Sequence, residues 1–286
     1  MPDDGERSAT PLRPEAQPTA TVVVPVHDRL EYTRQFVDHL VACTDLSSTE
    51  VVFVDNGSRD GTPEFLRTCR FATVLRCEEN AGVAAAWNRG ARAGHAPVVC
   101  FVNNDVVVTP GWLEALLAGL AASPATWCVG PLYTKGERPP RFDVLAASVA
   151  SMPPETRVGG IVGFCFAVRR DAFERLRGFD EGFRIAGWED TDFYVRLVDR
   201  GHPPRVVMNS LIHHYGGRTG DDMSSEVREV MMANQARFAH KWGRDIPPAV
   251  EEPFVLPEGV VMFRGPGYER ERRGLLGRIR ARRRRA

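Results

Sequence analysis

Three consecutive polar residues, Asn103, Asn104 and Asp105, separate two apolar runs, Val98–Val102 and Val106–Val108. Polar groups within a buried strand cost free energy unless a partner satisfies them. One carboxylate and two carboxamides offer hard oxygen ligands and amide donors, which suit a magnesium-class cation that holds a phosphate. The alternative is a turn between two strands, since Asn and Asp are common turn residues.

A second candidate group is the acidic pair Glu189 and Asp190, which follows Trp188. Apolar residues spaced four apart come next, so the pair is predicted to lie at the N-terminus of a helix. Carboxylates are common there as caps that complement the helix dipole, without any catalytic role. Two crowded carboxylates against an apolar wall also tend to raise one pKa, and such a group could act as a general base.

Two adjacent histidines, His213 and His214, follow the largely apolar stretch 206–212 and precede a glycine turn. A single histidine at the end of a strand is more often a structural residue than a ligand. Two together, downstream of an acidic pair, are compatible with contact to a metal or a phosphate.

The elements that would position these groups alternate between strands and helices. Residues 20–26 form a nearly continuous β-branched run, typical of a strand buried on both faces in a parallel sheet. The predicted order is strand 20–26, helix 30–43, strand 50–54, helix 62–69, strand 71–75, helix 83–93 and strand 98–102. Such alternation predicts an α/β fold with a doubly wound sheet, whose ligands bind at the carboxyl ends of the strands. The polar groups that fall at that edge are His27, Asp55, Asn80 and residues 103–105.

The loop after the first strand distinguishes two kinds of nucleotide site. A dinucleotide-binding fold needs glycines there, so that the backbone can approach a pyrophosphate. The loop here reads Pro25-Val26-His27-Asp28-Arg29 and contains no glycine. The pattern excludes a dehydrogenase. It is compatible with a mononucleotide, because Asp55 could bind a ribose hydroxyl or a base edge.

The second half of the chain is predicted to be less regular. Residues 129–154 are rich in proline and are expected to be irregular, as loops over a cleft or as a segment that crosses between two lobes. A strand is predicted over 159–168, with glycines that could admit a ligand, and a helix over 169–176. A further helix is expected over 226–242, with an apolar side that packs on the sheet. That side comprises Val230, Met231, Phe238 and Trp242.

The length of 286 residues allows one large domain or two small ones. The balance of 37 acidic and 37 basic residues gives no indication of a nucleic-acid partner. Six cysteines are scattered without a Cys-x-x-Cys pair, which is typical of reduced core thiols in a cytosolic protein. No apolar run approaches the roughly 18 residues of a membrane span.

The two ends differ from the rest in composition. Residues 1–19 are polar and rich in proline and are expected to be a disordered leader. The segment 269–286 is rich in arginine with a few apolar residues. Such a segment can lie on an anionic surface, which would bring a cytoplasmic protein to the inner face of the membrane. A solvated end is the alternative.

Seven motifs, taken in order, resemble those of the family 2 glycosyltransferases with the GT-A fold. They lie at residues 22–29, 54–62, 80–90, 101–105, 178–183, 187–193 and 214–219. The first reads Val-Val-Val-Pro-Val-His-Asp-Arg, the fourth Phe-Val-Asn-Asn-Asp and the sixth Gly-Trp-Glu-Asp-Thr-Asp-Phe. The resemblance covers residues 20–242.

This resemblance implies a single GT-A domain over residues 20–245, with an open, twisted, mostly parallel sheet flanked by helices. Its first half, 20–125, would bind the nucleotide sugar. Its second half, 126–245, would bind the acceptor and carry the catalytic base. Residues 246–286 would form an extension with the basic segment at its end.

The resemblance also implies inverting transfer of a sugar from a UDP-, GDP- or dTDP-linked donor to an acceptor hydroxyl. Acceptors of the family include glycans, lipid-linked intermediates and natural products. A divalent cation, Mg²⁺ or Mn²⁺, would be bound by Asp105 and His214. The His-x-Gly-Gly-x-Thr spacing favours His214 over His213. Asp190 would be the general base, with Glu189 beside it.

Other positions receive roles by the same resemblance. Asn103 and Asn104 would position the donor, and Gly163 and Trp188 would lie on the acceptor side. The nucleotide would contact a further set of residues near the strand ends, namely Pro25, Val26, His27, Arg29, Asp55 and Gly82.

Two other functions are open at this level. A nucleotidyltransferase also combines a nucleotide, a divalent cation and an open α/β sheet. It would normally carry a glycine-rich loop with a basic residue after the first strand, which is absent here. An inactive nucleotide-sugar-binding module would keep the fold without the chemistry. The presence of Asp105, Asp190 and His214 argues against it.

Overall fold

The computed structural model describes residues 17–216, 225–243 and 251–264. The expected leader therefore lies largely outside the described residues, and the arginine-rich segment 269–286 lies wholly outside them. The helices are α1 (Leu30–Cys43), α2 (Thr62–Leu66), α3 (Val83–Ala93), α4 (Trp112–Ala121), α5 (Phe142–Ala150), α6 (Arg170–Arg175), α7 (Glu189–Asp199) and α9 (Ser225–Trp242). The strands are β1 (Ala20–Val26), β2 (Thr49–Asn56), β3 (Ala72–Cys77), β4 (Val98–Val102), β5 (Val106–Val108), β6 (Cys128–Lys135), β7 (Thr156–Val158), β8 (Cys165–Arg169), β9 (Arg205–His214), β10 (Glu251–Leu256) and β11 (Gly259–Arg264).

Four neighbouring strands form the parallel half of the sheet, in the order β4-β1-β2-β3. Along β1, Val22 and Val24 belong to the core on one face of the sheet, and Val23 belongs to the core on the other. Branched apolar side chains on both faces explain why this strand lies in the interior of the sheet. Because β1, β2 and β4 run in the same direction, the loops that follow them meet at one edge.

The other half of the sheet is mixed. β8 pairs antiparallel with β4 and β6, and β9 runs parallel to β6 while it pairs antiparallel with β5 and β7. Pro131 lies at a register shift between β6 and β9, where the ladder tolerates a residue without an amide hydrogen. The hairpin β10–β11 joins the sheet through Met262, which pairs with Tyr133 of β6.

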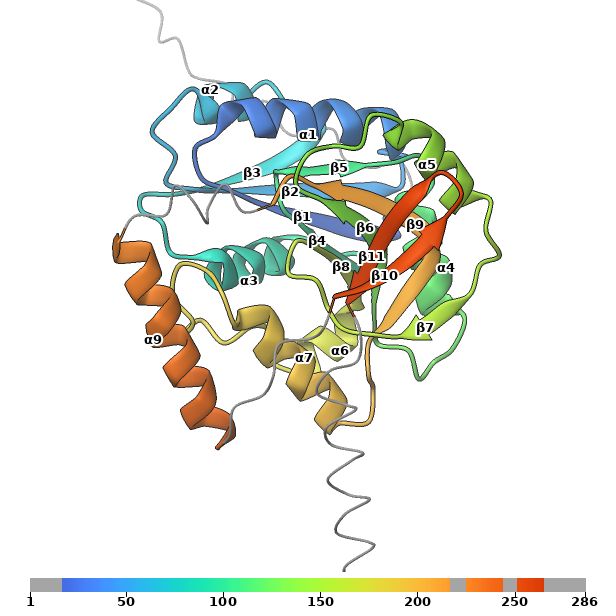
Figure 1. Cartoon of the computed structure of the whole chain (residues 1–286). Coiled ribbons are helices and arrows are strands. Elements are labelled where there is room, and N and C mark those ends of the chain that lie inside the picture. The colour runs from blue at the N-terminus through green and yellow to red at the C-terminus, as the bar shows by residue number, and fades with distance from the viewer. Residues whose placement is uncertain (1–16, 217–224, 244–250, 265–286) are drawn as a thin grey trace, which may run out of the picture.

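Helices cover both faces of the sheet (Figure 1). On one face, α1 and α4 bury Phe36 and Trp112 against the strands. On the other, α3, α6 and α7 bury Trp87, Phe173 and Phe193. α5 packs with β9 and β11 around a third apolar cluster. The open α/β sheet predicted from the sequence is confirmed. Among the helices in the described part of the chain, none is both long and apolar enough to cross a bilayer.

Several segments differ from the predictions made for them. Residues 129–154, expected to be irregular, contain most of β6 and all of α5. The strand expected to start at residue 159 begins only at Cys165, and residues 159–164 form a loop. Residues 251–264, which were assigned to an extension, form a hairpin paired with β6. The prediction missed β6 because a proline interrupts its apolar run, whereas the register shift accommodates that proline.

Candidate functional site

The loop after β1 begins the site at the carboxyl edge of the parallel strands. Pro25 and Val26 are buried in the sheet, so of the expected nucleotide contacts there only His27 and Arg29 expose side chains. Nδ1 of His27 lies 3.0 Å from the carbonyl oxygen of Asn56. Asp28 and Arg29 both have positive φ, 54° and 60°, and this left-handed backbone turns the chain directly into α1.

Asp55, at the end of β2, is almost fully buried, and the protein itself satisfies its carboxylate. One oxygen accepts a hydrogen bond of 2.9 Å from the amide of Ser58, and the other is paired with Arg76. Arg76 also donates to the carbonyl of Ser58 at 2.9 Å, and its side chain is half-exposed. Asp55 therefore holds the turn that contains Ser58 and the guanidinium of Arg76. Arg76, rather than Asp55, is the exposed side chain of this pair. The sequence analysis did not single out Arg76.

The turn before α3 is closed by two asparagines. Nδ2 of Asn56 donates to Oδ1 of Asn80 at 2.8 Å. Gly82 adopts a φ of 90°, and a Cβ atom at this position would lie 2.7 Å from the amide nitrogen of Ile185. The next amide, of Val83, donates to the carbonyl of Ile185 at 2.7 Å. Gly82 thus lets the donor-side loop approach the segment that leads into α7.

Residues 103–105 form the turn between β4 and β5. The amide of Asn103 donates to the carbonyl of Phe164 at 3.0 Å, and Nδ2 of Asn104 donates to Oγ1 of Thr33 at 2.9 Å. Oδ2 of Asp105 lies 3.2 Å from Nε2 of His214, because β5 pairs with β9 in the register Val106↔His214. The polar turn and the histidine are therefore brought together as expected.

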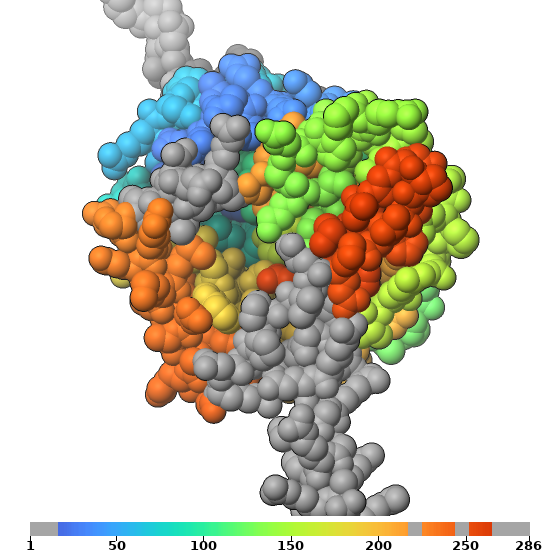
Figure 2. All heavy atoms as spheres, in the orientation of Figure 1, coloured from blue at the N-terminus to red at the C-terminus, as the bar shows by residue number. Residues whose placement is uncertain are grey.

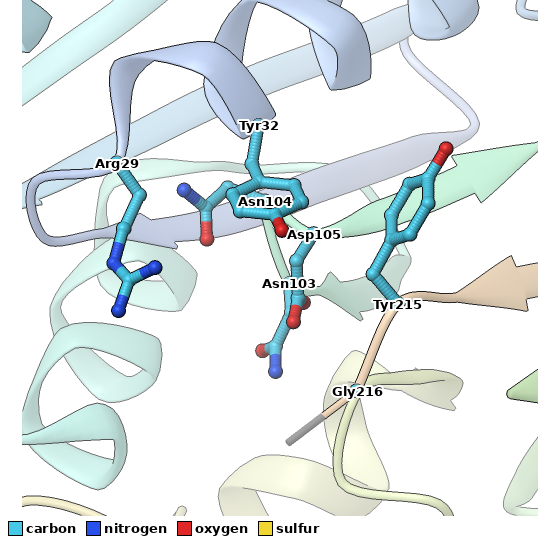
Figure 3. A pocket seen from close by; sticks show the side chains of 7 residues that line it. All are labelled: Arg29, Tyr32, Asn103, Asn104, Asp105, Tyr215 and Gly216. Atoms are coloured by element: carbon cyan, nitrogen blue, oxygen red, sulfur yellow. The ribbon is translucent and has the colours of Figure 1, made fainter. Parts of the chain in front are cut away.

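A pocket of about 190 Å³ opens over this turn (Figure 3). Arg29 enters it from the start of α1, and Tyr215 lies across from it, with the side chains of residues 103–105 between them (Figure 3). Tyr32 and Tyr215 pack with ring centroids 5.5 Å apart, and Gln35 donates to the hydroxyl of Tyr215 at 2.8 Å. Neither tyrosine was predicted to line a site, since Tyr32 lies within a helix and Tyr215 occupies a variable position of the His-x-Gly-Gly-x-Thr motif.

The residues at the floor of this pocket fit a divalent cation. Oδ1 of Asp105, Oδ1 of Asn103 and Nδ1 of His214 are buried without a hydrogen-bond partner. The 3.2 Å between Asp105 and His214 also suits two adjacent ligands of one octahedral cation, with bonds of about 2.1 Å. Within the described ranges, no cluster of three or more His, Cys, Asp or Glu side chains could hold a metal. Further ligands would have to be carboxamide, donor phosphate or water oxygens.

His213 points to the opposite face of β9. Its side chain is fully buried, its Nδ1 lies 2.8 Å from Oγ1 of Thr134, and its ring packs on Phe142. Burial, together with the charge of Arg138, lowers the pKa of His213 to about 4. Successive residues of a strand face opposite sides, so only one of the two histidines can reach Asp105.

The acidic pair begins α7, as expected. Trp188 precedes it with a φ of 76° and packs on Phe238 of α9 at 4.9 Å between ring centroids. Glu189 is buried, its Oε2 has no hydrogen-bond partner, and burial, followed by the negative charge of Asp190, raises its pKa to about 8. Glu189 is therefore mainly protonated at neutral pH.

Both oxygens of the Asp190 carboxylate are held. Oδ1 accepts from the amide of Thr191 at 2.6 Å and from its hydroxyl at 3.1 Å. Oδ2 accepts from Arg264 of β11 at 2.8 Å. The side chain is 13% exposed, so the carboxylate keeps contact with solvent despite these bonds.

Two consecutive residues, Gly163 and Phe164, contact Asp190 and the Asp105–His214 pair, respectively. A Cβ atom on Gly163 would lie 2.7 Å from Oδ2 of Asp190, so the carboxylate rests on the glycine backbone. The ring of the next residue, Phe164, stacks on His214 with centroids 3.9 Å apart and an angle of 20°. Asp190 and the Asp105–His214 pair therefore both contact one short segment. Gly163 was expected on the acceptor side, whereas Phe164 was not predicted.

The loop before α7 is held by a buried asparagine of α9. Oδ1 of Asn234 accepts from the amide of Arg184 at 3.1 Å, and Nδ2 donates to the carbonyls of Arg184, Ala186 and Gly187 at 2.8, 3.1 and 3.1 Å. Asn234 is 3% exposed. Figure 2 shows the surface hollowed between α9, in orange, and the hairpin β10–β11, in red. Both elements thus reach the site from outside the parallel sheet.

Comparison with known proteins gives relatives that include several named glycosyltransferases. The "Pre-mycofactocin glycosyltransferase" of Mycobacterium tuberculosis is 29% identical over 270 residues, which cover 87% of this chain and 53% of that protein. The "N-acetylglucosaminyl-diphospho-decaprenol L-rhamnosyltransferase" of the same organism is 30% identical over 217 residues, which cover 62% of this chain and 70% of that protein. The chain thus spans about half the length of the first of these relatives.

Solved structures share the fold. A crystal structure of GalNAc-T7 with UDP, GalNAc and Mn2+ superposes with a TM-score of 0.63 at 19% identity, covering 79% of this chain and 48% of that one. The mannosyltransferase PcManGT from Pyrobaculum calidifontis, in complex with GDP-Man and Mn2+, gives a TM-score of 0.58 at 20% identity, covering 82% and 66%. The fold is that of the GT-A glycosyltransferases.

Family profiles agree with these likenesses. The profile described as the N-terminal domain of galactosyltransferase matches residues 144–215, which include β8, α7 and β9. The profile of glycosyl transferase family 2 matches residues 21–177, more than half of the 286 residues, and the chain therefore belongs to glycosyl transferase family 2.

Proposed function

We propose that the protein transfers a sugar from a nucleotide-diphosphate sugar to an acceptor hydroxyl, with inversion at the anomeric carbon and with a divalent cation. The observation that supports this proposal is that the Asp105–His214 pair and Asp190 contact adjacent residues of one segment, Phe164 and Gly163. A single displacement needs one group that stabilises the leaving diphosphate and another that takes the proton of the nucleophile from the opposite face.

The donor half of the proposal assigns the parallel half of the fold, residues 20–125, to the nucleotide sugar. His27, Arg29 and Arg76 are exposed groups at the ends of β1, β2 and β3, where they would contact the nucleotide. Asn103 and Asn104 would orient the diphosphate and the sugar. Bound Mg²⁺ or Mn²⁺ would neutralise the charge that develops on the leaving group.

Asp105 and His214 would hold that cation. The unpartnered Oδ1 of Asp105 and the 3.2 Å between its Oδ2 and Nε2 of His214 support this assignment. The solved structures of similar fold carry Mn2+ together with UDP or GDP-Man, which is consistent with it. We extend the proposal to UDP-, GDP- and dTDP-linked sugars as candidate donors.

The acceptor half, residues 126–245, would present Asp190 as the general base. Its carboxylate would accept the proton of the acceptor hydroxyl while the acceptor oxygen attacks the anomeric carbon. Glu189, buried and mainly protonated, would support the start of α7, and Trp188 and Gly163 would border the acceptor. The names of the relatives support a glycan, a lipid-linked intermediate or a natural product as the acceptor.

The proposal is tested with a panel of UDP-, GDP- and dTDP-sugars and Mg²⁺ or Mn²⁺, with release of the nucleotide diphosphate as the measurement. At least one donor should be turned over by the wild type. Asp190→Asn should lose turnover while its donor affinity, measured by thermal shift, stays within about twofold. Asp171→Asn, which changes a well-exposed carboxylate on α6, is the matched control. Undiminished turnover by Asp190→Asn would exclude Asp190 as the base.

A further inference from the structure

Arg264, the last residue of β11, reaches the proposed base from outside the segments that match family profiles. Those segments end at residue 215, whereas Arg264 belongs to the hairpin β10–β11. Nη1 of Arg264 lies 2.8 Å from Oδ2 of Asp190 and donates to the carbonyl of Ile161 at 2.6 Å. One guanidinium nitrogen thus links the carboxylate to the loop that carries Gly163.

The backbone of Arg264 is also fixed to this loop. Its carbonyl accepts from the amide of Gly160 at 2.6 Å, and a Cβ atom on Gly159 would lie 2.9 Å from the same carbonyl oxygen. The side chain of Arg264 is only 22% exposed. A side chain held at both its backbone and its head group loses little further entropy when it fixes a partner.

The hairpin that carries Arg264 is anchored in the core. Val261 is fully buried and Phe263 is 9% exposed, and both pack in the cluster that contains α5 and β9. Met262, on the other face of β11, packs on the main core beside Tyr133. The strand therefore presents Arg264 from a packed element, which gives its guanidinium a defined position.

The Asp190 carboxylate accepts hydrogen bonds from one residue next to it in sequence and from one residue far from it in sequence. Thr191, the next residue, occupies Oδ1, and Arg264 is the partner of Oδ2. A carboxylate held on one oxygen can still rotate about its Cβ–Cγ bond, whereas a bond on the second oxygen fixes its plane. A base must point at the proton it accepts, and a small error in its placement lowers the rate strongly.

We propose that Arg264 is a positioning residue that aims the Asp190 carboxylate at the acceptor hydroxyl, so that the C-terminal hairpin is part of the catalytic site. This inference rests on the proposed function, in which Asp190 is the base. The opposite role is also chemically conceivable: a guanidinium that occupies Oδ2 would block the base, and its removal would then raise turnover. The two roles predict rate changes of opposite sign.

The test compares Arg264→Ala, Arg264→Lys and Val260→Ala with the wild type, using the donor identified in the panel. Arg264→Ala should lower kcat about 10- to 100-fold with the KM for the donor unchanged, because only the placement of the base is lost. Arg264→Lys should recover part of kcat, since an ammonium can donate one charged hydrogen bond. Added guanidinium should partly restore Arg264→Ala. Val260, half-exposed in the same hairpin, is the control and should leave kcat unchanged.

The outcomes separate the two proposals. If the wild type is active, Asp190→Asn is inactive and Arg264→Ala keeps or exceeds the wild-type kcat, the positioning role is wrong while the proposed function stands. If Asp190→Asn is fully active or the wild type turns over no donor, both proposals fail. If Arg264→Ala melts well below the wild type, Arg264→Gln, which keeps the aliphatic stem to Cδ and a polar end without the charge, replaces it. Wild-type kcat in a folded Arg264→Gln likewise overturns the role.

Discussion

Two regions of the molecule are built in different ways. One is the proposed donor edge, formed by the loops that follow β1, β2 and β4, and the other is the surroundings of Asp190. At the donor edge, short loops after successive parallel strands bind one another, as in the bond between the amide of Asp28 and Ser58 at 2.8 Å. Around Asp190, the supporting groups come from the β8 loop, from α9 and from the C-terminal hairpin. The first arrangement follows from the topology of the sheet. The second depends on contacts between segments of the second half of the chain that are far apart in sequence.

The Asp105–His214 turn and the Asp190 carboxylate also differ in how far the protein satisfies their polar atoms. Asn103, Asp105 and His214 each keep a buried polar atom without a partner. The Asp190 carboxylate has partners on both oxygens. Unpartnered buried atoms are costly and are expected where a ligand will supply the missing bonds. The turn at residues 103–105 is thus suited to bind a ligand, and the Asp190 carboxylate is already oriented.

The largest expected effect is on the donor edge. Asp105→Asn should weaken donor binding in the presence of Mg²⁺ or Mn²⁺ by at least about 100-fold, because it removes a charged ligand of the cation. Titration calorimetry with the nucleoside diphosphate measures this loss. Wild type treated with a chelator is the matched control and should bind as weakly as the variant. Metal-dependent binding that persists in Asp105→Asn would show that the cation lies elsewhere.

A smaller effect is expected on the base side, from a methyl group placed under the carboxylate. Gly163→Ala would bring a Cβ atom to 2.7 Å from Oδ2 of Asp190. The carboxylate must move, so kcat should fall about 10- to 100-fold while donor binding stays unchanged. Gly130→Ala is the matched control, since its Cβ atom would meet only the carbonyl oxygen of Cys165 at 3.7 Å. If Gly163→Ala instead weakens donor binding and spares kcat, the division between the two regions is wrong.

The contrast between loops of neighbouring strands and supports distant in sequence explains which parts of the candidate site the sequence could predict. The gathering of polar residues at the carboxyl edge follows from the sequence, because β-branched runs identify parallel strands and the polar residues that end them must share one edge. Their roles in binding a donor stay predictions. His214 was selected over His213 only by resemblance, and the strand register then placed it beside Asp105. Arg76 was missed because it lies in a strand, outside any loop motif, and only pairing with β2 brings it to Asp55.

The base side was predicted less well, because its supports are distant in sequence. Arg264 lies in a short hairpin whose apolar residues alternate weakly with polar ones, and nothing in its local pattern indicates Asp190 as its partner. Asn234 occupies a core position of a helix for which only apolar residues were expected on that side. A buried polar residue of this kind is recognised only once the carbonyls that it binds are in place.

Loss of the Asn234 contacts should affect stability as well as turnover. Asn234→Ala leaves the loop carbonyls of residues 184, 186 and 187 without their donor and should lower the free energy of unfolding by about 1 to 3 kcal/mol. It should also lower kcat severalfold, because this loop leads into Glu189 and Asp190. Denaturant titration and steady-state kinetics measure the two effects. Gln235→Ala, at the exposed next position of α9, should change neither. Unchanged stability of Asn234→Ala would mean that α9 does not hold the loop.

The smallest effect concerns the protonation of Glu189. Its pKa is raised from 4.5 to about 8 in the folded protein, so between these values the folded state holds a proton that the unfolded state has lost. Stability from this group is therefore fully present below pH 4.5, and it is lost as the pH rises through about 8. Glu189→Gln has no such proton, so the melting temperature of the wild type should fall relative to that of the variant between pH 5 and pH 8.5. Glu226→Gln, an exposed acid in the first turn of α9, is the control and should give a curve parallel to the wild type. Parallel curves for Glu189→Gln would show instead that Glu189 is ionised beside Asp190, and the start of α7 would then carry two negative charges rather than one.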